Sequence, residues 1–116
     1  MVGYKYSPNS GDDISLNAVT TGTGTVKALN DCRQCGWMFI GAGTITGGTV
    51  KVESAATVDY AGTWNELDSL TASDLTGGAA TGGTYPMPPG GFVRGRVSSD
   101  ITGGGTITVK INGLLG

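Results

Sequence analysis

Hydrophobic and polar residues alternate along much of this chain. In residues 92–97, Val93 and Val97 share one face, and Arg94 and Arg96 share the other. A period of two is typical of a half-buried β-strand, because successive side chains of a strand point to opposite faces of a sheet. We therefore expect a strand here, with its valines in a core and its arginines outside.

A second alternating run follows shortly afterwards. Ile107, Val109 and Ile111 share one face of residues 106–112, and polar residues occupy the other face. Glycines at 103–105 separate the two runs, and a glycine cluster between alternating runs favours a β-hairpin. We therefore expect these last two strands to pair with each other.

Other short segments show strand patterns between glycine-rich turns. They are residues 14–19, 25–29, 36–41, 49–54 and 63–70. Residues 36–41 are almost entirely apolar, which predicts a central strand buried on both faces. In residues 49–54, Val50 and Val52 are predicted to face inward, with Lys51 and Glu53 outward.

Residues 77–91 are rich in glycine and proline and are predicted to form one long loop. Together the patterns predict an all-β protein. The expected fold is an antiparallel β-sandwich, Ig-like or jelly-roll-like, of about seven or eight short strands.

The N-terminal residues differ from the rest. Tyr4 and Tyr6 alternate, and turn-forming residues follow them. We therefore expect an extended arm at residues 1–13, followed by a single domain at 14–116. An arm of this kind becomes ordered when it docks on a partner, so Tyr4 and Tyr6 are candidate interaction residues.

The amino-acid composition argues against several classes of protein. The chain has 116 residues, of which 22 are glycine, and its formal net charge is −2. The absence of a basic excess argues against nucleic-acid binding. No apolar run approaches the ~18 residues of a membrane span, and the N-terminus lacks the apolar segment of a secretory signal.

The candidate chemistry is sparse. The chain has no histidine, the commonest general base and a frequent metal ligand. No pattern places two carboxylates in one cleft, and no phosphate-binding glycine motif is present. We therefore predict no enzyme activity, no catalytic residue, no cofactor and no metal site.

Cys32 and Cys35 form a C-x-x-C motif that has three interpretations. It could be a redox dithiol, half of a zinc site, or a pair of structural loop cysteines beside a tight turn. Zinc needs four ligands, so a second subunit would have to supply two. A redox motif normally begins a helix in a βαβ unit. The structural interpretation is favoured.

Surface charge offers a further candidate site. If the last two strands pair, Arg94, Arg96 and Lys110 form one basic stripe, suited to a carboxylate-rich partner surface or a phosphate. The alternative is an ordinary solvated face, with the arginines paired to Glu53 or Asp100.

Aromatic residues allow two interpretations. Trp37 and Phe39 lie in the most apolar run and are predicted to be in the core. Tyr60, Trp64 and Tyr85 would form a sugar-binding platform if exposed, or belong to the core if buried.

Three motifs carry a family resemblance across residues 62–113. They are G-T-W-N-E-L at 62–67, G-F-V-R-G-R-V at 91–97 and G-G-T-I-T-V at 104–109. This part of the chain resembles the small β-sandwich capsid decoration (cement) proteins of tailed bacteriophages. Similar strand pairs also occur in tail-associated and carbohydrate-binding sandwiches.

The resemblance implies a structural virion protein, made in the host cytoplasm, that binds the outside of the assembled capsid and stabilises the shell. Its expected partners are the major capsid protein and further copies of itself, as a homotrimer. The alternative function is a carbohydrate-binding or tail-associated adhesion module, with a glycan as partner.

Overall fold

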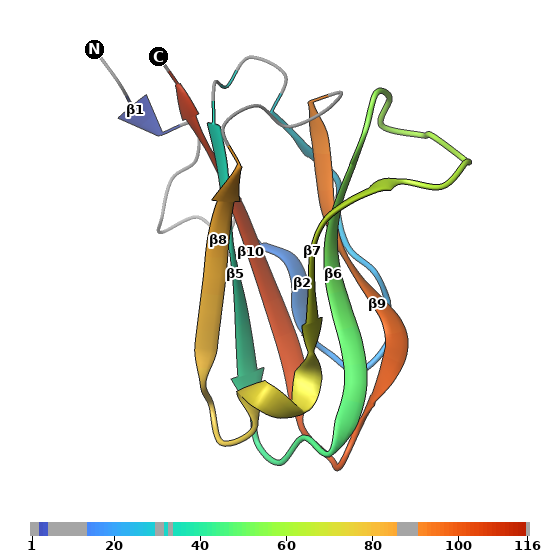
Figure 1. Ribbon diagram of the computed structural model, residues 1–116, viewed down its shortest axis with the longest axis vertical. Helices are drawn as coiled ribbons and strands as arrows, with labels where there is room; N and C mark the ends of the chain where they lie inside the picture. Colours follow the sequence, from blue (N-terminus) through green and yellow to red (C-terminus); the bar gives the residue numbers. More distant parts are fainter. Residues whose placement is uncertain (1–2, 5–13, 30–31, 33, 86–90, 116) are drawn as a thin grey trace.

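Two antiparallel sheets pack face to face in the computed structural model of the protein (Figure 1). The structure describes residues 3–4, 14–29, 32, 34–85 and 91–115. Within these ranges the chain forms ten strands and one short 3₁₀ helix, η1 (Ala72–Leu75), with no α-helix. The predicted all-β sandwich is therefore confirmed.

Sheet A has five strands in the order β1-β10-β5-β8, with β2 also paired to β10. Their bounds are β1 (Gly3–Tyr4), β2 (Ile14–Val19), β5 (Gln34–Ala42), β8 (Ala80–Tyr85) and β10 (Thr106–Leu115).

Sheet B also has five strands, in the order β3-β9-β6-β7, with β4 paired to β9. Their bounds are β3 (Gly22–Thr23), β4 (Lys27–Ala28), β6 (Gly47–Ala55), β7 (Asn65–Thr71) and β9 (Phe92–Thr102). In the described part of the chain, no helix is long and apolar enough to cross a membrane.

The core lies between the sheets and consists of the inward residues of both. Sheet A contributes mainly residues of β5 and β10, and sheet B contributes residues of β6 and β9. Among its buried members are Trp37, Phe39, Val50, Val52, Val93, Val97, Ile107, Val109 and Ile111. The predicted inward faces of the last two strands, of residues 49–54 and of Trp37 and Phe39 are confirmed.

The predicted hairpin of the last two strands is wrong. β9 pairs with β6 in sheet B, and β10 pairs with β5 in sheet A. Gly103 and Gly104 have φ angles of 105° and 96°, a region that glycine adopts without strain. The glycine turn therefore arches from one sheet to the other, and the two aliphatic rows face each other across the core.

The two rows are in close contact at Gly95. A Cβ atom added at Gly95 would lie 3.0 Å from both Cβ and Cγ1 of Val109. Glycine is therefore needed on β9 so that the valine of the opposite sheet can pack against its backbone.

Three other predictions need correction. β5 is central, but Met38 is 46% exposed on the outer face of sheet A, so the strand is not buried on both faces. The predicted loop at 77–91 contains β8, which pairs with β5 over six residues. Residues 25–29 form only the two-residue β4.

The first described residues of the predicted arm form strand β1, which pairs with β10. Gly3 and Tyr4 pair with Leu115 and Leu114 of β10. Tyr6 and the other residues at 5–13 lie outside the described ranges, so the arm there stays a prediction.

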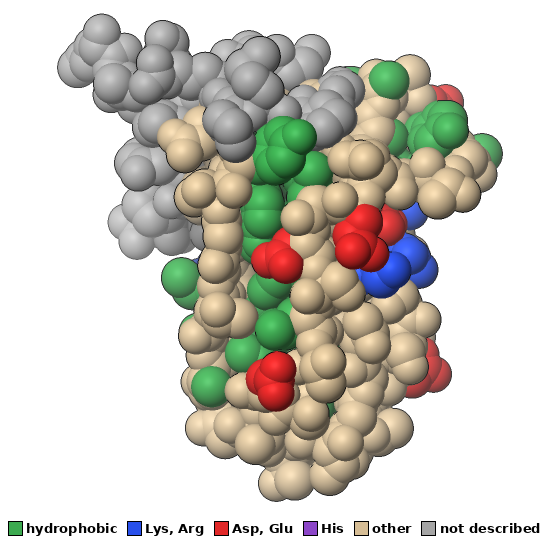
Figure 2. Space-filling model, in the orientation of Figure 1, with side chains coloured by type: hydrophobic (Ala, Val, Ile, Leu, Met, Phe, Trp, Pro, Cys, Tyr) green, Lys and Arg blue, Asp and Glu red, His purple; other side chains and the backbone are tan. Residues whose placement is uncertain are grey.

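The edge of the sandwich formed by β7 and β8 faces the viewer in Figures 1 and 2. Hydrophobic side chains are visible between the two sheets along this edge, with carboxylates beside them. The Trp37 indole crosses from sheet A to sheet B, and its Nε1 donates a 2.8 Å hydrogen bond to Asp68 on β7. This bond ties the two sheets together at that edge.

The packing at Gly95 yields a stability prediction. Gly95→Ala should lower the free energy of unfolding by about 1–3 kcal/mol, because the new methyl group overpacks the contact with Val109. Denaturant unfolding measures the change.

Gly36→Ala on β5 is the matched control. A Cβ at Gly36 would meet first the side-chain oxygen of Asn112, at 3.2 Å, which can rotate away. The control should change stability by less than about 0.5 kcal/mol. Equal effects of the two substitutions would contradict the proposed close contact.

Candidate functional site

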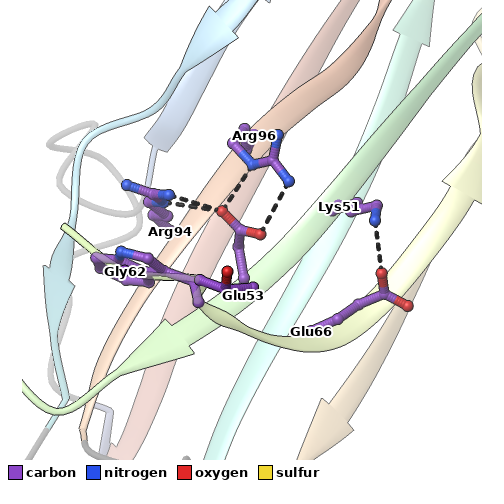
Figure 3. A pocket seen from close by; sticks show the side chains of 8 residues that line it. Lys51, Glu53, Gly62, Glu66, Arg94 and Arg96 are labelled. Carbon is purple, nitrogen blue, oxygen red and sulfur yellow. Dashed lines mark hydrogen bonds and ion pairs between the residues drawn. The ribbon is translucent and has the colours of Figure 1, made fainter. Parts of the chain in front are cut away.

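A solvent-open cavity of about 370 Å³ lies on the outer face of sheet B. Its charged residues come from three neighbouring strands, β6, β7 and β9, and a tryptophan precedes β7. The lining consists of Lys51, Glu53, Gly62, Thr63, Trp64, Glu66, Arg94 and Arg96. Figure 3 shows Glu53 between the two arginines, with Lys51 and Glu66 paired to one side.

Strand register brings these charges together. Glu53 of β6 is directly opposite Arg94 of β9, and Lys51 is opposite Arg96. Directly opposite residues of an antiparallel pair share one face and have neighbouring side chains. Since Val50 and Val52 of β6 point into the core, the alternation places Lys51 and Glu53 on the outer face.

Glu53 faces outward but is only 3% exposed, because the two arginines cover it. Its Oε1 accepts hydrogen bonds from Nε of Arg94 at 3.0 Å and from Nε of Arg96 at 2.8 Å. Nη2 of Arg94 lies 2.9 Å from the same oxygen, and Nη2 of Arg96 donates to Oε2 at 3.3 Å. A buried carboxylate is tolerated here because two guanidinium groups replace its lost hydration.

Trp64 forms one wall of the cavity and fixes Arg94. The guanidinium carbon of Arg94 lies 3.9 Å from the centroid of the Trp64 ring, a cation–π arrangement. Nε1 of Trp64 donates to the Tyr60 carbonyl at 2.9 Å. The ring is therefore anchored to its own loop while its face holds the arginine.

A second ion pair completes the lining. Nζ of Lys51 lies 2.8 Å from Oε1 of Glu66, whose side chain is 49% exposed. A pair this open to water contributes little stability, since solvent screens it. Lys51 and Glu66 therefore set the charge of the cavity rim more than they stabilise the fold.

The predicted basic stripe forms only in part. Arg94 and Arg96 lie together, and the alternative pairing with Glu53 is confirmed. Lys110 lies on β10 in sheet A, so it cannot join them; the stripe depended on the hairpin that does not form. Asp100 instead accepts a hydrogen bond from the Thr21 hydroxyl at 2.8 Å.

The candidate sugar-binding aromatics do not form a platform. Trp64 is 5% exposed and lies under Arg94, outside the central core. Tyr85 is half-buried against the core, whereas Tyr60 is 46% exposed. Only one of the three rings is therefore open to stacking, which weakens the glycan alternative.

Cys32 and Cys35 are both buried in the core cluster. Burial, with a smaller contribution from Cys32, raises the pKa of the Cys35 thiol to about 11. A thiol with so high a pKa is mostly protonated at neutral pH and is therefore a poor nucleophile. Among the described residues, no three potential ligands gather around a metal position. The burial of both thiols favours the structural interpretation of the motif.

Sequence patterns missed two parts of the site. One is the burial of Glu53, and the other is the contact between Trp64 and Arg94. The sequence did contain a clue to the burial of Glu53: it is a negatively charged outward residue, and the outward residues Arg94 and Arg96 of another strand are positively charged. This clue is useful only if residues 47–55 are known to pair with residues 92–102, and local sequence patterns do not reveal which strands pair.

Comparisons with known proteins found no matching family model, no similar curated protein and no similar solved structure.

The buried carboxylate gives a second stability prediction. Glu53→Gln should lower the free energy of unfolding by about 1–3 kcal/mol, because two neighbouring guanidinium groups lose their shared counter-charge. Partial exposure of both arginines limits the loss.

Glu66→Gln is the control, because it removes one carboxylate from the same cavity at an exposed position. It should cost only about 0–1 kcal/mol in denaturant unfolding. If Glu53→Gln cost no more than Glu66→Gln, the shared carboxylate would have no special role in holding the arginines.

Proposed function

We propose that the protein is a structural virion component of a tailed bacteriophage, binding the outside of the assembled capsid as a decoration protein. The family resemblance of residues 62–113 supports this assignment. Its motifs fall on β7, β9 and β10 and on the turns that lead into them, which makes them part of the sandwich framework. The proposed role is non-enzymatic.

The observation that carries the proposal is the edge strand β8. Among the described residues, this six-residue strand pairs with β5 alone, in continuous register, and it has no charged side chain. An edge of this kind leaves backbone groups ready to pair with another chain, and monomeric proteins usually block such edges.

The other described edges are blocked. β7 carries Glu66 and Asp68 and has a register shift against β6. β2 pairs with β10 through two register shifts, and β1, β3 and β4 are each two residues long. The contrast supports an assembly role for β8, in a homotrimer or against the major capsid protein.

The predicted arm adds a second docking element. Gly3 and Tyr4 pair with the C-terminal end of β10, so the N-terminal segment starts at that end of sheet A. In the proposal, Tyr4 and Tyr6 contact the shell there. A protein that binds only the assembled shell stabilises it by mass action, and many copies add their effects.

The test uses capsids of the encoding phage that lack this protein. Purified protein should form trimers by light scattering and sediment with these capsids, but not with unassembled major capsid protein. A protein that stays monomeric at high concentration and remains in the supernatant would contradict the proposal. Binding to a polysaccharide instead would favour the adhesion alternative.

Thr84→Lys places a charge on the exposed edge strand and should reduce trimer formation or capsid binding. Ser98→Lys adds the same charge at an exposed position of β9, which is paired on both sides, and is the matched control. Equal behaviour of the two variants would exclude β8 as the assembly edge.

A further inference from the structure

The two arginines of the cavity have more hydrogen-bonding capacity than Glu53 uses. A guanidinium group carries five N–H donors. The contacts with Glu53 involve Nε and Nη2 of each arginine. Within the described part of the chain, Nη1 of Arg94 and Nη1 of Arg96 donate to no residue, so at least their four N–H groups remain for a ligand.

The charges that line the cavity do not cancel. Lys51, Arg94 and Arg96 contribute three positive charges, and Glu53 and Glu66 contribute two negative ones. The lining therefore has one surplus positive charge. On a protein whose net charge is −2, this is a local departure from the overall sign.

The surplus charge is held in a fixed geometry. The Trp64 ring supports the Arg94 guanidinium, and Glu53 links both arginines through one oxygen. Side chains fixed in this way lose little conformational entropy when a ligand binds. The cavity is also open to solvent and large enough for a small organic acid.

We propose that this cavity binds a single carboxylate group, at N–H groups of its arginines that Glu53 leaves unused. One surplus charge matches a monoanion, whereas a phosphate dianion would be under-compensated and repelled by Glu66. The planar fork of a guanidinium group also matches the geometry of a carboxylate. This inference goes beyond the proposed function, because it concerns a ligand group and needs no capsid.

Two kinds of molecule could supply the carboxylate. One is an acidic side chain of a polypeptide, and the other is an acidic sugar such as a uronic acid. Both present the same planar monoanion, and the rest of the ligand decides between them.

The experiment is an NMR titration of the full-length protein at low ionic strength. The probes are a short peptide with one glutamate and an amidated C-terminus, glucuronate, inorganic phosphate, and the same amidated peptide with glutamine. Saturable shifts are expected at Lys51, Glu53, Arg94 and Arg96 with the two carboxylates. The glutamine peptide should cause none, and the tighter of the two carboxylates identifies the source.

Two substitutions test the charge argument, with one control. Arg96→Gln removes the surplus charge and should weaken binding at least about tenfold. Glu66→Gln raises the surplus at an exposed position, so the fold stays intact, and should tighten binding about two- to threefold. Lys110→Gln makes the same charge change as Arg96→Gln on the other sheet and should have no effect.

Three results would overturn the proposal. They are the absence of saturable shifts with either carboxylate, tighter binding of phosphate than of carboxylate, and equal loss of binding in Arg96→Gln and Lys110→Gln. The last result would mean that the ligand responds only to the overall charge of the protein. None of these outcomes bears on capsid binding, so the two proposals fail separately.

Discussion

Packing of two aliphatic rows against each other is the constraint on which this structure depends. Val93, Gly95 and Val97 of β9 face Ile107, Val109 and Ile111 of β10 across the sandwich. The two strands are consecutive in the chain, and a glycine turn joins them. Placing β9 and β10 in opposite sheets buries both rows against each other. In a hairpin the two rows would lie side by side on one face of a sheet, and other residues would have to cover them.

The positions of the charged residues follow from the placement of β9 and β10 in opposite sheets. Once β9 belongs to sheet B, it pairs with β6, and Arg94 is placed directly opposite Glu53. A buried carboxylate is costly, and here two guanidinium groups and an aromatic ring offset that cost. The outer face of sheet B therefore carries the fixed charges of the cavity, while Lys110 lies on sheet A.

Local pattern was enough to predict the fold class and most inward faces. Period-two alternation depends only on residues within one strand, so Val50, Val52 and Val93 were placed correctly. It could not reveal which strands pair, because pairing depends on contacts between residues far apart in the sequence. The hairpin and the basic stripe with Lys110 were both wrong for this reason.

The burial of Glu53 was missed for a related reason. An outward position on a strand normally means exposure to water, and only the side chains of the neighbouring strand reverse that expectation. β8 was missed because alanine, threonine and glycine give no hydrophobic alternation, so its strand conformation comes from pairing with β5. Weakly patterned edge strands and buried charges are therefore the features for which local sequence reasoning has the least information.

A nuclear Overhauser map of β9 and β10 tests directly whether the two strands belong to opposite sheets. We expect contacts from the Gly95 α-protons to the Val109 methyl groups, together with backbone contacts of β9 to β6 and of β10 to β5. Backbone contacts in antiparallel register between residues 92–97 and 106–112 would indicate a hairpin within one sheet. That result would contradict the packing of the core and the placement of the charged site.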